Sequence, residues 1–368
     1  MSEKAKARYA AGWALAMALS AACYCDDSSH AASRLPAAQA CSASVYTTLR
    51  DIPDDPTVQF PVTCRISLDR DDLVTQDLAF FGAGASGASI DCHGGTIGIP
   101  GKAPRDAPPT ILIASVHQDN GAWSVPHDIS IKNCRIYGSV HIMGLGANAE
   151  ADEVRQSSLN RNHTQFAQSV APTSIVLDKV TIIAAGPEAL YIAPGVTHVT
   201  LSHSVIGGTV KTHAVYMDAE SAHNSIVDTR FETRNGHREM MAIDGSANNL
   251  IQGNSFINAD HGGIYVFRNC GEGGTIRHQE PRYNRFLNNR FDYDKGTSPY
   301  PAIWLGAHEP FMSLYCYDDP PAPFGSGANN GNFADNNIVT NTVIDDGTAS
   351  LIRDNGAHNQ ISGTVVKP

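Results

Sequence analysis

Two aspartates occupy equivalent places in the chain, each directly after a short apolar segment. Asp218 follows residues 215–217 and Asp244 follows residues 241–243. If these segments are neighbouring parallel strands, the two carboxylates lie about 4.8 Å apart. Outward carboxylates at that spacing repel each other, so the pKa of one is raised unless a cation lies between them. The pair predicts a general acid with a nucleophile or base, or a Ca²⁺ site; the structural alternative is that each aspartate only begins a turn.

Charged and histidine side chains crowd the turns around these segments. A polymer that carries carboxylates needs a cation to neutralise them, a base for the C5 proton and a proton donor for the leaving oxygen. A neutral glycan needs two carboxyl groups in opposite protonation states. The cluster holds candidates for both reactions, although each His or Arg taken singly also suits a loop hydrogen bond. Its members are Lys211, His213, His237, Arg238, Glu239, Asp260, His261, Arg268, Glu272, Arg277 and His278.

Aromatic residues accompany the same segments. Tyr216, Ala242, Tyr265 and Trp304 fall at one position when the segments are aligned. Sugar rings pack their C–H faces on aromatic rings, so this column predicts carbohydrate contact; the alternative is that the rings only cover an outer wall. Two long inserts, 145–174 and 306–332, show no strand pattern and are expected to form walls of a groove.

These patterns define the predicted site. No residue is assigned as a metal ligand, and Ca²⁺ is kept as the alternative for the two aspartates. The predicted catalytic residues are Asp218, Asp244, Glu239, His261, Arg268, His213 and Glu272. The predicted substrate-binding residues are Tyr216, Tyr265, Trp304, Lys211, Arg238, Arg277 and His278.

A repeat must position these side chains. An apolar pair spaced by five positions recurs, and its shortest steps are 23 to 25 residues. Short strands with period-2 alternation at this repeat length predict stacked coils, in which each strand pairs in parallel with its equivalent in the next coil. The pairs are Cys92/Ile97, Ile131/Ile136, Leu177/Ile182, Leu201/Ile206, Ile226/Phe231, Ile251/Phe256, Phe286/Phe291, Ile338/Val343 and Ile361/Val366.

An asparagine precedes the first apolar position of several coils by two residues. Asparagine tolerates left-handed backbone geometry, and its amide can bond the equivalent amide of the next coil. The residues are Asn224, Asn249, Asn284, Asn336 and Asn359. The sequence therefore predicts an all-β protein, a single-stranded right-handed parallel β-helix. A leucine-rich solenoid would need a Leu-rich consensus that is absent.

Coil length, asparagine ladder and alternation together make residues 70–368 similar to the pectate-lyase-like superfamily of right-handed parallel β-helix proteins. The resemblance implies polysaccharide lyases, glycoside hydrolases, sugar-polymer epimerases or non-catalytic surface proteins. The segment 268–280, RNCGEGGTIRHQE, resembles a motif of bacterial β-helix proteins and implies no activity. The paired Asp-Asp and Gly-His-Gly signature of polygalacturonases, the Asp-Pro-His-Asp signature of alginate epimerases and a clear Lys/Arg pair of the lyases are absent.

The remaining residues predict export. Residues 1–32 combine a basic start with a short apolar run and form a signal peptide, with a lipoprotein signal ending at Cys23 as the alternative. Residues 33–69 are expected to be a linker and N-terminal cap, and 70–368 the β-helix. Export implies an oxidising compartment, so the expected disulfides are Cys41–Cys64, Cys92–Cys134 and Cys270–Cys316.

The charge of the chain limits the classes of partner that it is expected to bind. A formal charge of −11 repels phosphate backbones and excludes general nucleic-acid binding. A membrane is expected to be contacted only through an N-terminal lipid anchor. The predicted function is that of an exported, periplasmic, secreted or outer-membrane, carbohydrate-active protein. The favoured reaction is that of a lyase or C5-epimerase on a uronate-containing polymer; the alternatives are a glycoside hydrolase using Asp218 and Asp244, and a non-catalytic glycan-binding envelope or adhesive protein.

Overall fold

A computed structural model describes residues 38–53, 55, 57–101, 108–148, 151–269, 272–294, 300–307 and 320–368. The predicted signal peptide and the Cys270–Cys316 pair lie outside these residues. Residues 36–368 form one compact unit. No helix among the described residues is long and apolar enough to span a bilayer.

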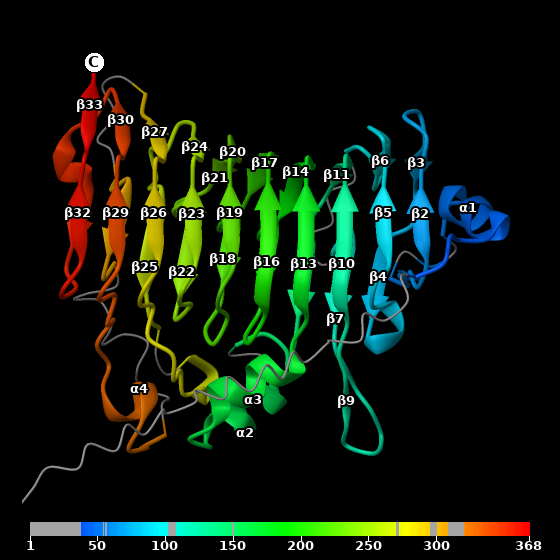
Figure 1. Ribbon diagram of the computed structural model, residues 1–368, viewed down its shortest axis with the longest axis horizontal. Helices are drawn as coiled ribbons and strands as arrows, with labels where there is room; N and C mark the ends of the chain where they lie inside the picture. The colour runs from blue at the N-terminus through cyan, green and yellow to red at the C-terminus, as the bar shows by residue number, and fades with distance from the viewer. Residues whose placement is uncertain are drawn as a thin grey trace, which may run out of the picture. The chain divides into compact units, whose positions relative to one another are not determined.

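Three long parallel sheets dominate the part of the chain that the structure describes, and their strands follow one another in chain order (Figure 1). Each coil contributes one strand to each sheet. Sheet 1 consists of β1 (Phe60–Pro61), β4 (Leu78–Phe81), β7 (Ile111–Ala114), β12 (Val140–Met143), β15 (Leu190–Ile192), β18 (Val215–Met217), β22 (Met241–Asp244), β25 (Ile264–Phe267), β28 (Ile303–Leu305) and β31 (Ile352–Asp354).

The other two sheets have the same order. Sheet 2 consists of β2 (Arg65–Ser67), β5 (Ser89–Asp91), β10 (His127–Lys132), β13 (Thr173–Asp178), β16 (Thr197–Ser202), β19 (Ser225–Val227), β23 (Leu250–Gln252), β26 (Arg285–Leu287), β29 (Ile338–Thr340) and β32 (Gln360–Ser362). Sheet 3 consists of β3 (Leu73–Val74), β6 (Thr96–Ile97), β11 (Arg135–Tyr137), β14 (Thr181–Gly186), β17 (Val205–Val210), β20 (Arg230–Phe231), β24 (Ser255–Phe256), β27 (Arg290–Asp292), β30 (Val343–Asp345) and β33 (Val365–Lys367), and β21 (Arg234–Asn235) pairs with β17.

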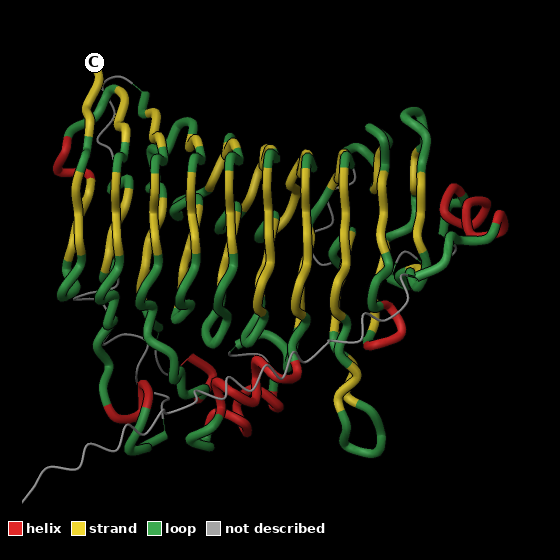
Figure 2. The backbone as a smooth tube through the Cα atoms, in the orientation of Figure 1, coloured by secondary structure: helices red, strands yellow, loops and turns green. Residues whose placement is uncertain are grey.

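Helices are few and lie outside the coils (Figure 2). The helix α1 (Ala43–Arg50) packs at the start of the stack, and α2 (Asp152–Ser158) and α3 (His163–Val170) form an insert between β12 and β13. The remaining elements are α4 (Gly325–Ala328), the antiparallel pair β8 (Val116–His117) and β9 (Trp123–Ser124), and the 3₁₀ turns η1 (Ala83–Ala85), η2 (Glu272–Gly274) and η5 (Ala349–Leu351).

The predicted right-handed parallel β-helix is confirmed, and this is the fold that the resemblance to the pectate-lyase-like superfamily implies. Alternation sends one apolar side chain per short strand inward, where equivalent residues of successive coils stack. Phe256 lies parallel to Phe231 and to Phe291, with ring centroids 4.7 Å apart in both pairs. The first coil already contains β1 and β2, so the coils begin before the expected boundary at residue 70. Pro61 and the charged Arg65 obscure the alternation there.

One predicted register is wrong by a single residue. The pair Ile338/Val343 was expected to face inward, but Val339 and Ile344 are the buried residues and pair with Phe286 and Phe291. In a strand, a shift of one position turns every side chain to the other face. The same shift makes Asn337, not Asn336, the ladder residue; Asn336 has a φ of +57° and turns the chain. Near the start, Ile90 replaces Cys92 as the residue in register with Ile131.

The asparagine ladder joins the coils by buried hydrogen bonds. The backbone N–H groups of Asn224, Asn249, Asn284 and Asn337 each donate to the side-chain oxygen of the next asparagine, over 2.7–3.0 Å. The last acceptor is Asn359. A second ladder starts at the following bend, where Thr229 N–H donates to Asn254 and Asn254 N–H donates to Asn289.

Replacement of Asn254 by alanine is expected to lower the free energy of unfolding by about 2–3 kcal/mol, because two buried backbone groups lose their partners. Its oxygen accepts from Thr229 N at 2.9 Å, and its amide donates to Ile226 O at 2.9 Å. Urea unfolding measures the change. The control Gln360→Ala removes an exposed amide and should change stability by less than about 0.5 kcal/mol. Equal effects of the two substitutions would contradict a stabilising ladder.

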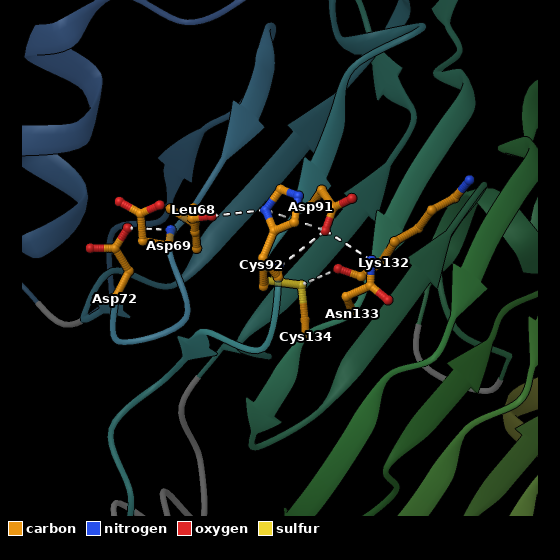
Figure 3. The surroundings of a disulfide bond; sticks show 9 residues. Leu68, Asp69, Asp72, Asp91, Cys92, Lys132, Asn133 and Cys134 are labelled. Carbon is orange, nitrogen blue, oxygen red and sulfur yellow. Dashed lines mark hydrogen bonds and ion pairs between the residues drawn. A yellow bond between two sulfur atoms is a disulfide. The ribbon is translucent and has the colours of Figure 1, made fainter.

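Two of the predicted disulfides are present. Cys41 bonds to Cys64, and Cys92 bonds to Cys134. The second bond links neighbouring coils at the end of sheet 2, beside a hydrogen bond from Asn133 Nδ2 to Asp91 Oδ1 of 2.9 Å (Figure 3). The N-terminal coils are therefore fastened covalently as well as by strand pairing.

Candidate functional site

An outward column of sheet 1 carries the aromatic residues. Tyr216, Ala242, Tyr265 and Trp304 pair in register on β18, β22, β25 and β28, as the sequence alignment predicts. The column extends further toward the N-terminus, through Tyr191 of β15 to His141 of β12. Because parallel pairing keeps equivalent residues in line, these side chains form one continuous outer stripe.

Two adjacent cavities lie along this stripe and share Glu188 and Tyr216 as lining residues. The first, the Asp218 cavity, has a volume of about 440 Å³, and its lining includes His141, Asn148, Glu188, Tyr191, Asp218 and Arg277. The second, the Glu239 cavity, has a volume of about 580 Å³, and its lining includes His213, Arg238, Glu239, His261, Tyr265 and Trp304. Together they form a groove along sheet 1 from β12 to β28.

Asp218 is a buried acid with every oxygen engaged. Its Oδ1 accepts from Asn148 Nδ2 at 2.6 Å and from the backbone N–H of Ala219 at 2.8 Å, and its Oδ2 accepts from the Tyr191 hydroxyl at 2.6 Å. Burial raises the pKa of Asp218 to about 6, against the opposing attraction of Arg277, and the nearby charge of Asp244 raises it further. The carboxyl group therefore titrates close to neutral pH.

Asp244 is fully buried in the neighbouring coil. Its Oδ2 accepts from the Tyr216 hydroxyl at 2.7 Å and from Asn269 Nδ2 at 2.9 Å, and its Oδ1 accepts from Asn269 N at 2.7 Å. Arg277 Nη1 lies 3.8 Å from Asp244 Oδ2 and supplies the neighbouring positive charge. The two aspartates are next to each other, as predicted, but their oxygens face hydroxyl, amide and guanidinium groups. This arrangement does not favour a shared Ca²⁺ ion, and no cluster of three metal-ligating side chains occurs in the described residues.

His141 is the neutral base candidate of the Asp218 cavity. Burial lowers its pKa to about 4, so the ring is uncharged at neutral pH. Its Nε2 is buried and has no hydrogen-bond partner among the described residues. The His141 and Tyr191 rings lie with centroids 5.7 Å apart on adjacent strands, so a base and a hydroxyl line the same cavity side by side.

Glu239 and His213 form a buried pair in the other cavity. His213 Nε2 lies 3.3 Å from Glu239 Oε1, and Arg238 Nε donates to Glu239 Oε2 at 3.3 Å. Burial acts to raise the pKa of Glu239, but the hydrogen bond and charge of His213, with a smaller contribution from Arg238, lower it to about 2. Glu239 is therefore a carboxylate that fixes the orientation of the His213 ring.

Glu220 fastens two inserts to the coil. It has a φ of +66° and is buried, and its Oε1 accepts from the backbone N–H of His278 at 2.7 Å and of Gln279 at 3.2 Å. Its Oε2 accepts from the Thr164 hydroxyl of α3. The insert after β25 is thus held beside the α2–α3 insert, and this contact places Arg277 at the Asp218 cavity.

Several predicted site residues lie outside the two cavities. Arg268 is buried, and its Nη2 donates to Asn329 O at 2.6 Å while its guanidinium stacks on Phe333. His278 Nε2 is 2.7 Å from Ser158 O, so its ring joins the insert to α2. Lys211 is exposed on a turn and does not line either cavity. These positions favour structural roles for Arg268 and His278. The side chain of Glu272 lies outside the described part of the structure.

Other residues of the groove were not predicted from the sequence. They are His141, Asn148, Glu188 and Tyr191. His141 and Tyr191 had a usable signal, because they occupy the same strand position as Tyr216. Asn148 and Glu188 belong to turns whose length differs between coils, so aligning the coils does not show which residues of these turns are equivalent.

A pH series should reveal the raised pKa of Asp218. The folded state holds the Asp218 proton up to pH about 6, whereas the ordinary value is 3.8, so the free energy of unfolding should fall by about 3 kcal/mol as the pH rises between these values. Asp218→Asn should remove this contribution to the dependence of the free energy of unfolding on pH. Urea unfolding between pH 4 and 7 tests it, with the exposed Asp228→Asn as control. Parallel stability curves for the wild type and Asp218→Asn would contradict the assignment.

No protein-family model and no curated protein matches this chain. Solved structures with a similar course of the chain include the surface protein and adhesin PfbA of Streptococcus pneumoniae, with 11% identity over 81% of this chain and 78% of that one and a TM-score of 0.47. An endo-xylogalacturonan hydrolase of Aspergillus tubingensis has 9% identity over 86% and 92% of the chains and a TM-score of 0.38. The A-module of the mannuronan C-5 epimerase AlgE6 of Azotobacter vinelandii has 11% identity over 83% and 81% and a TM-score of 0.31. Likenesses this distant do not identify a reaction.

Proposed function

We propose that this chain is a carbohydrate-active enzyme, a lyase or C5-epimerase that acts on a uronate-containing polymer laid along the groove. One observation supports this reaction above the others. The residues that line the Asp218 cavity include a neutral histidine, with one ring nitrogen that has no partner in the described part of the chain, a tyrosine whose hydroxyl donates to a carboxylate, and a buried arginine; they are His141, Tyr191 and Arg277. These are the base, the proton donor and the cation that the chemistry requires.

Each group has a defined part in the proposed reaction. Arg277 pairs with the uronate carboxylate, which acidifies the C5 proton, and the neutral His141 ring, which lines the cavity, takes that proton. In a lyase, the electron pair left at C5 forms the C4–C5 double bond as the C4–O bond breaks, and the leaving oxygen takes the proton of Tyr191. In an epimerase, C5 takes a proton from the opposite side instead. Asp218 acts as a positioning residue, because its Oδ2 fixes the Tyr191 hydroxyl at 2.6 Å.

The hydrolase alternative has less support. A pair of catalytic carboxyl groups needs access to the glycosidic oxygen and to C1. Asp244 is completely buried, and both of its oxygens accept protein hydrogen bonds. A non-catalytic glycan-binding protein would use the same groove, and an activity assay distinguishes it from an enzyme.

A polymer panel tests the proposal. Purified protein is incubated with alginate, polygalacturonate and glucuronan, and the ultraviolet absorbance of unsaturated uronate and the number of reducing ends are followed together. Equal growth of both signals is the lyase result, and a change in the uronate composition without chain cleavage is the epimerase result. Reducing ends without unsaturation would establish a hydrolase, and binding without any change would establish a glycan-binding protein. Either outcome would overturn the proposal.

We further propose that the chain is exported. The disulfides Cys41–Cys64 and Cys92–Cys134 support an oxidising compartment. Whether residues 1–32 are removed as a signal peptide, or Cys23 receives a lipid, is decided by mass spectrometry of the protein from its native envelope and medium. An intact, unmodified N-terminus in the cytoplasmic fraction would contradict export.

A further inference from the structure

Three residues that line the Glu239 cavity carry a buried polar atom without a hydrogen-bond partner among the described residues. The atoms are His213 Nδ1, Tyr265 Oη and Trp304 Nε1. His213 is 3% exposed and Tyr265 is 8% exposed, and both line the cavity together with Trp304. Buried polar atoms are nearly always paired, so three unpaired ones around one cavity point to a ligand that supplies the partners.

The hydrogen-bonding character of these atoms can be assigned. Glu239 is a carboxylate and only accepts, so the His213 Nε2 that faces it, 3.3 Å away, carries the proton. Trp304 Nε1 only donates, and the Tyr265 hydroxyl donates or accepts. The lining of the cavity therefore offers one donor, one group that serves as both, and the second nitrogen of a histidine whose other nitrogen faces Glu239.

A hydroxyl-rich ligand matches this set, and the charges of the lining disfavour a carboxylate. Sugar hydroxyl groups donate and accept at once, so neighbouring hydroxyls can satisfy both His213 Nδ1 and Trp304 Nε1. The carboxylates of Glu188 and Glu239 also line this cavity, and the guanidinium of Arg238 is bonded to Glu239, so the lining provides little positive charge to offset a ligand anion.

We propose that the Glu239 cavity is a second sugar subsite, which binds an uncharged sugar residue of the polymer next to the uronate held in the Asp218 cavity. The part of this proposal that concerns the adjacent uronate rests on the proposed function, whereas the binding of a neutral sugar is independent of it. The two cavities share Glu188 and Tyr216, so adjacent residues of one chain can occupy them together. The favoured substrate class is then a heteropolymer in which a uronate alternates with, or carries, a neutral sugar.

Calorimetric titration with neutral oligosaccharides tests the subsite. The probes are the tetrasaccharides of xylose, mannose, galactose and glucose, together with a carboxyl-reduced uronate tetrasaccharide and its unreduced parent. We expect a neutral probe to bind, and the double variant Tyr265→Phe/Trp304→Phe to weaken it about 10- to 30-fold, since each substitution removes one hydrogen-bonding group and leaves an aromatic ring in place. Tyr265→Phe keeps its ring and should keep the melting temperature of the wild type. Trp304→Phe also exchanges the indole for a smaller ring, which loses contacts with Tyr265 and Arg353, and should lower it.

Controls separate this inference from the proposed function. Tyr137→Phe, on sheet 3, should leave the binding of neutral probes unchanged. The inference is overturned if no neutral probe binds, or if the double variant binds every probe as the wild type does. If no uronate polymer is converted but a neutral probe binds and the double variant weakens it, the proposed function fails and the subsite stands. If a mixed polymer is converted with an unchanged KM in the double variant, the subsite fails and the function stands.

Discussion

Replacement of His141 by glutamine is expected to lower kcat/KM on the responsive uronate polymer by about 100- to 10,000-fold, the contribution of a positioned general base. The His141 ring lines the Asp218 cavity, and burial keeps it neutral by lowering its pKa to about 4. Glutamine has a similar size and can form hydrogen bonds, but it cannot take up a proton at neutral pH. The measurement is steady-state turnover of the polymer that the panel identifies.

The pH profile gives this prediction a second readout. Since His141 is neutral above pH about 4, its own titration should not limit the rate between pH 5 and 8, and a change of rate near pH 6 should belong to Asp218 and disappear in Asp218→Asn. The exposed His198 provides the control, and His198→Gln should retain the activity of the wild type. Undiminished turnover by His141→Gln would remove His141 from the reaction.

Replacement of Arg277 by methionine is expected to destabilise the fold by about 3–5 kcal/mol, because it leaves a buried carboxylate without its neighbouring cation. Arg277 is 2% exposed, and its Nη1 lies 3.8 Å from Oδ2 of the fully buried Asp244. The loss of positive charge should also raise the pKa of Asp218 above about 6. Urea unfolding measures the stability, and the same variant should lose turnover on uronate polymers.

A double variant identifies the electrostatic part of this effect. Asp244→Asn removes the buried charge, so Arg277→Met combined with Asp244→Asn should be more stable than Arg277→Met alone. The control Arg290→Met removes an exposed arginine that pairs with Asp292 and Asp345, and it should cost less than about 1 kcal/mol. If the double variant loses the sum of the two single effects, the guanidinium does not stabilise Asp244.

The fold was predictable because the sequence repeat determines which residues of each coil face the core. Uninterrupted coils show the same apolar spacing, and residues such as Phe231 and Phe256 stack in the core as the spacing requires. The predicted register was wrong at Asn336 and Asn337. Two asparagines are adjacent there, and the long insert before them prevents counting residues from the last regular coil. The insert 145–174 was expected to be a polar loop, but it contains α2 and α3 and packs apolar residues such as Val154 and Ala167 together.

The site was predictable only where the coils are regular. Asp218, Asp244 and Tyr216 follow from the aligned segments, and the structure places them next to one another. The position of Arg277 depends on an insert that Glu220 fastens, and no periodicity determines that contact. Arg268 and His278 belong to the same insert but point to Asn329 and Ser158, because long polar side chains in a loop satisfy local carbonyl groups first.

The central claim is that the groove removes a proton from C5 of a uronate, and proton NMR in deuterium oxide tests it most directly. The polymer is incubated with wild-type protein and with His141→Gln, and the H5 resonance of the uronate is followed. We expect H5 to disappear with the wild type, through exchange for deuterium in an epimerase or with the appearance of an H4 vinyl resonance in a lyase, and to persist with His141→Gln. An unchanged H5 signal in a polymer that the wild-type protein cleaves or binds would contradict the claim.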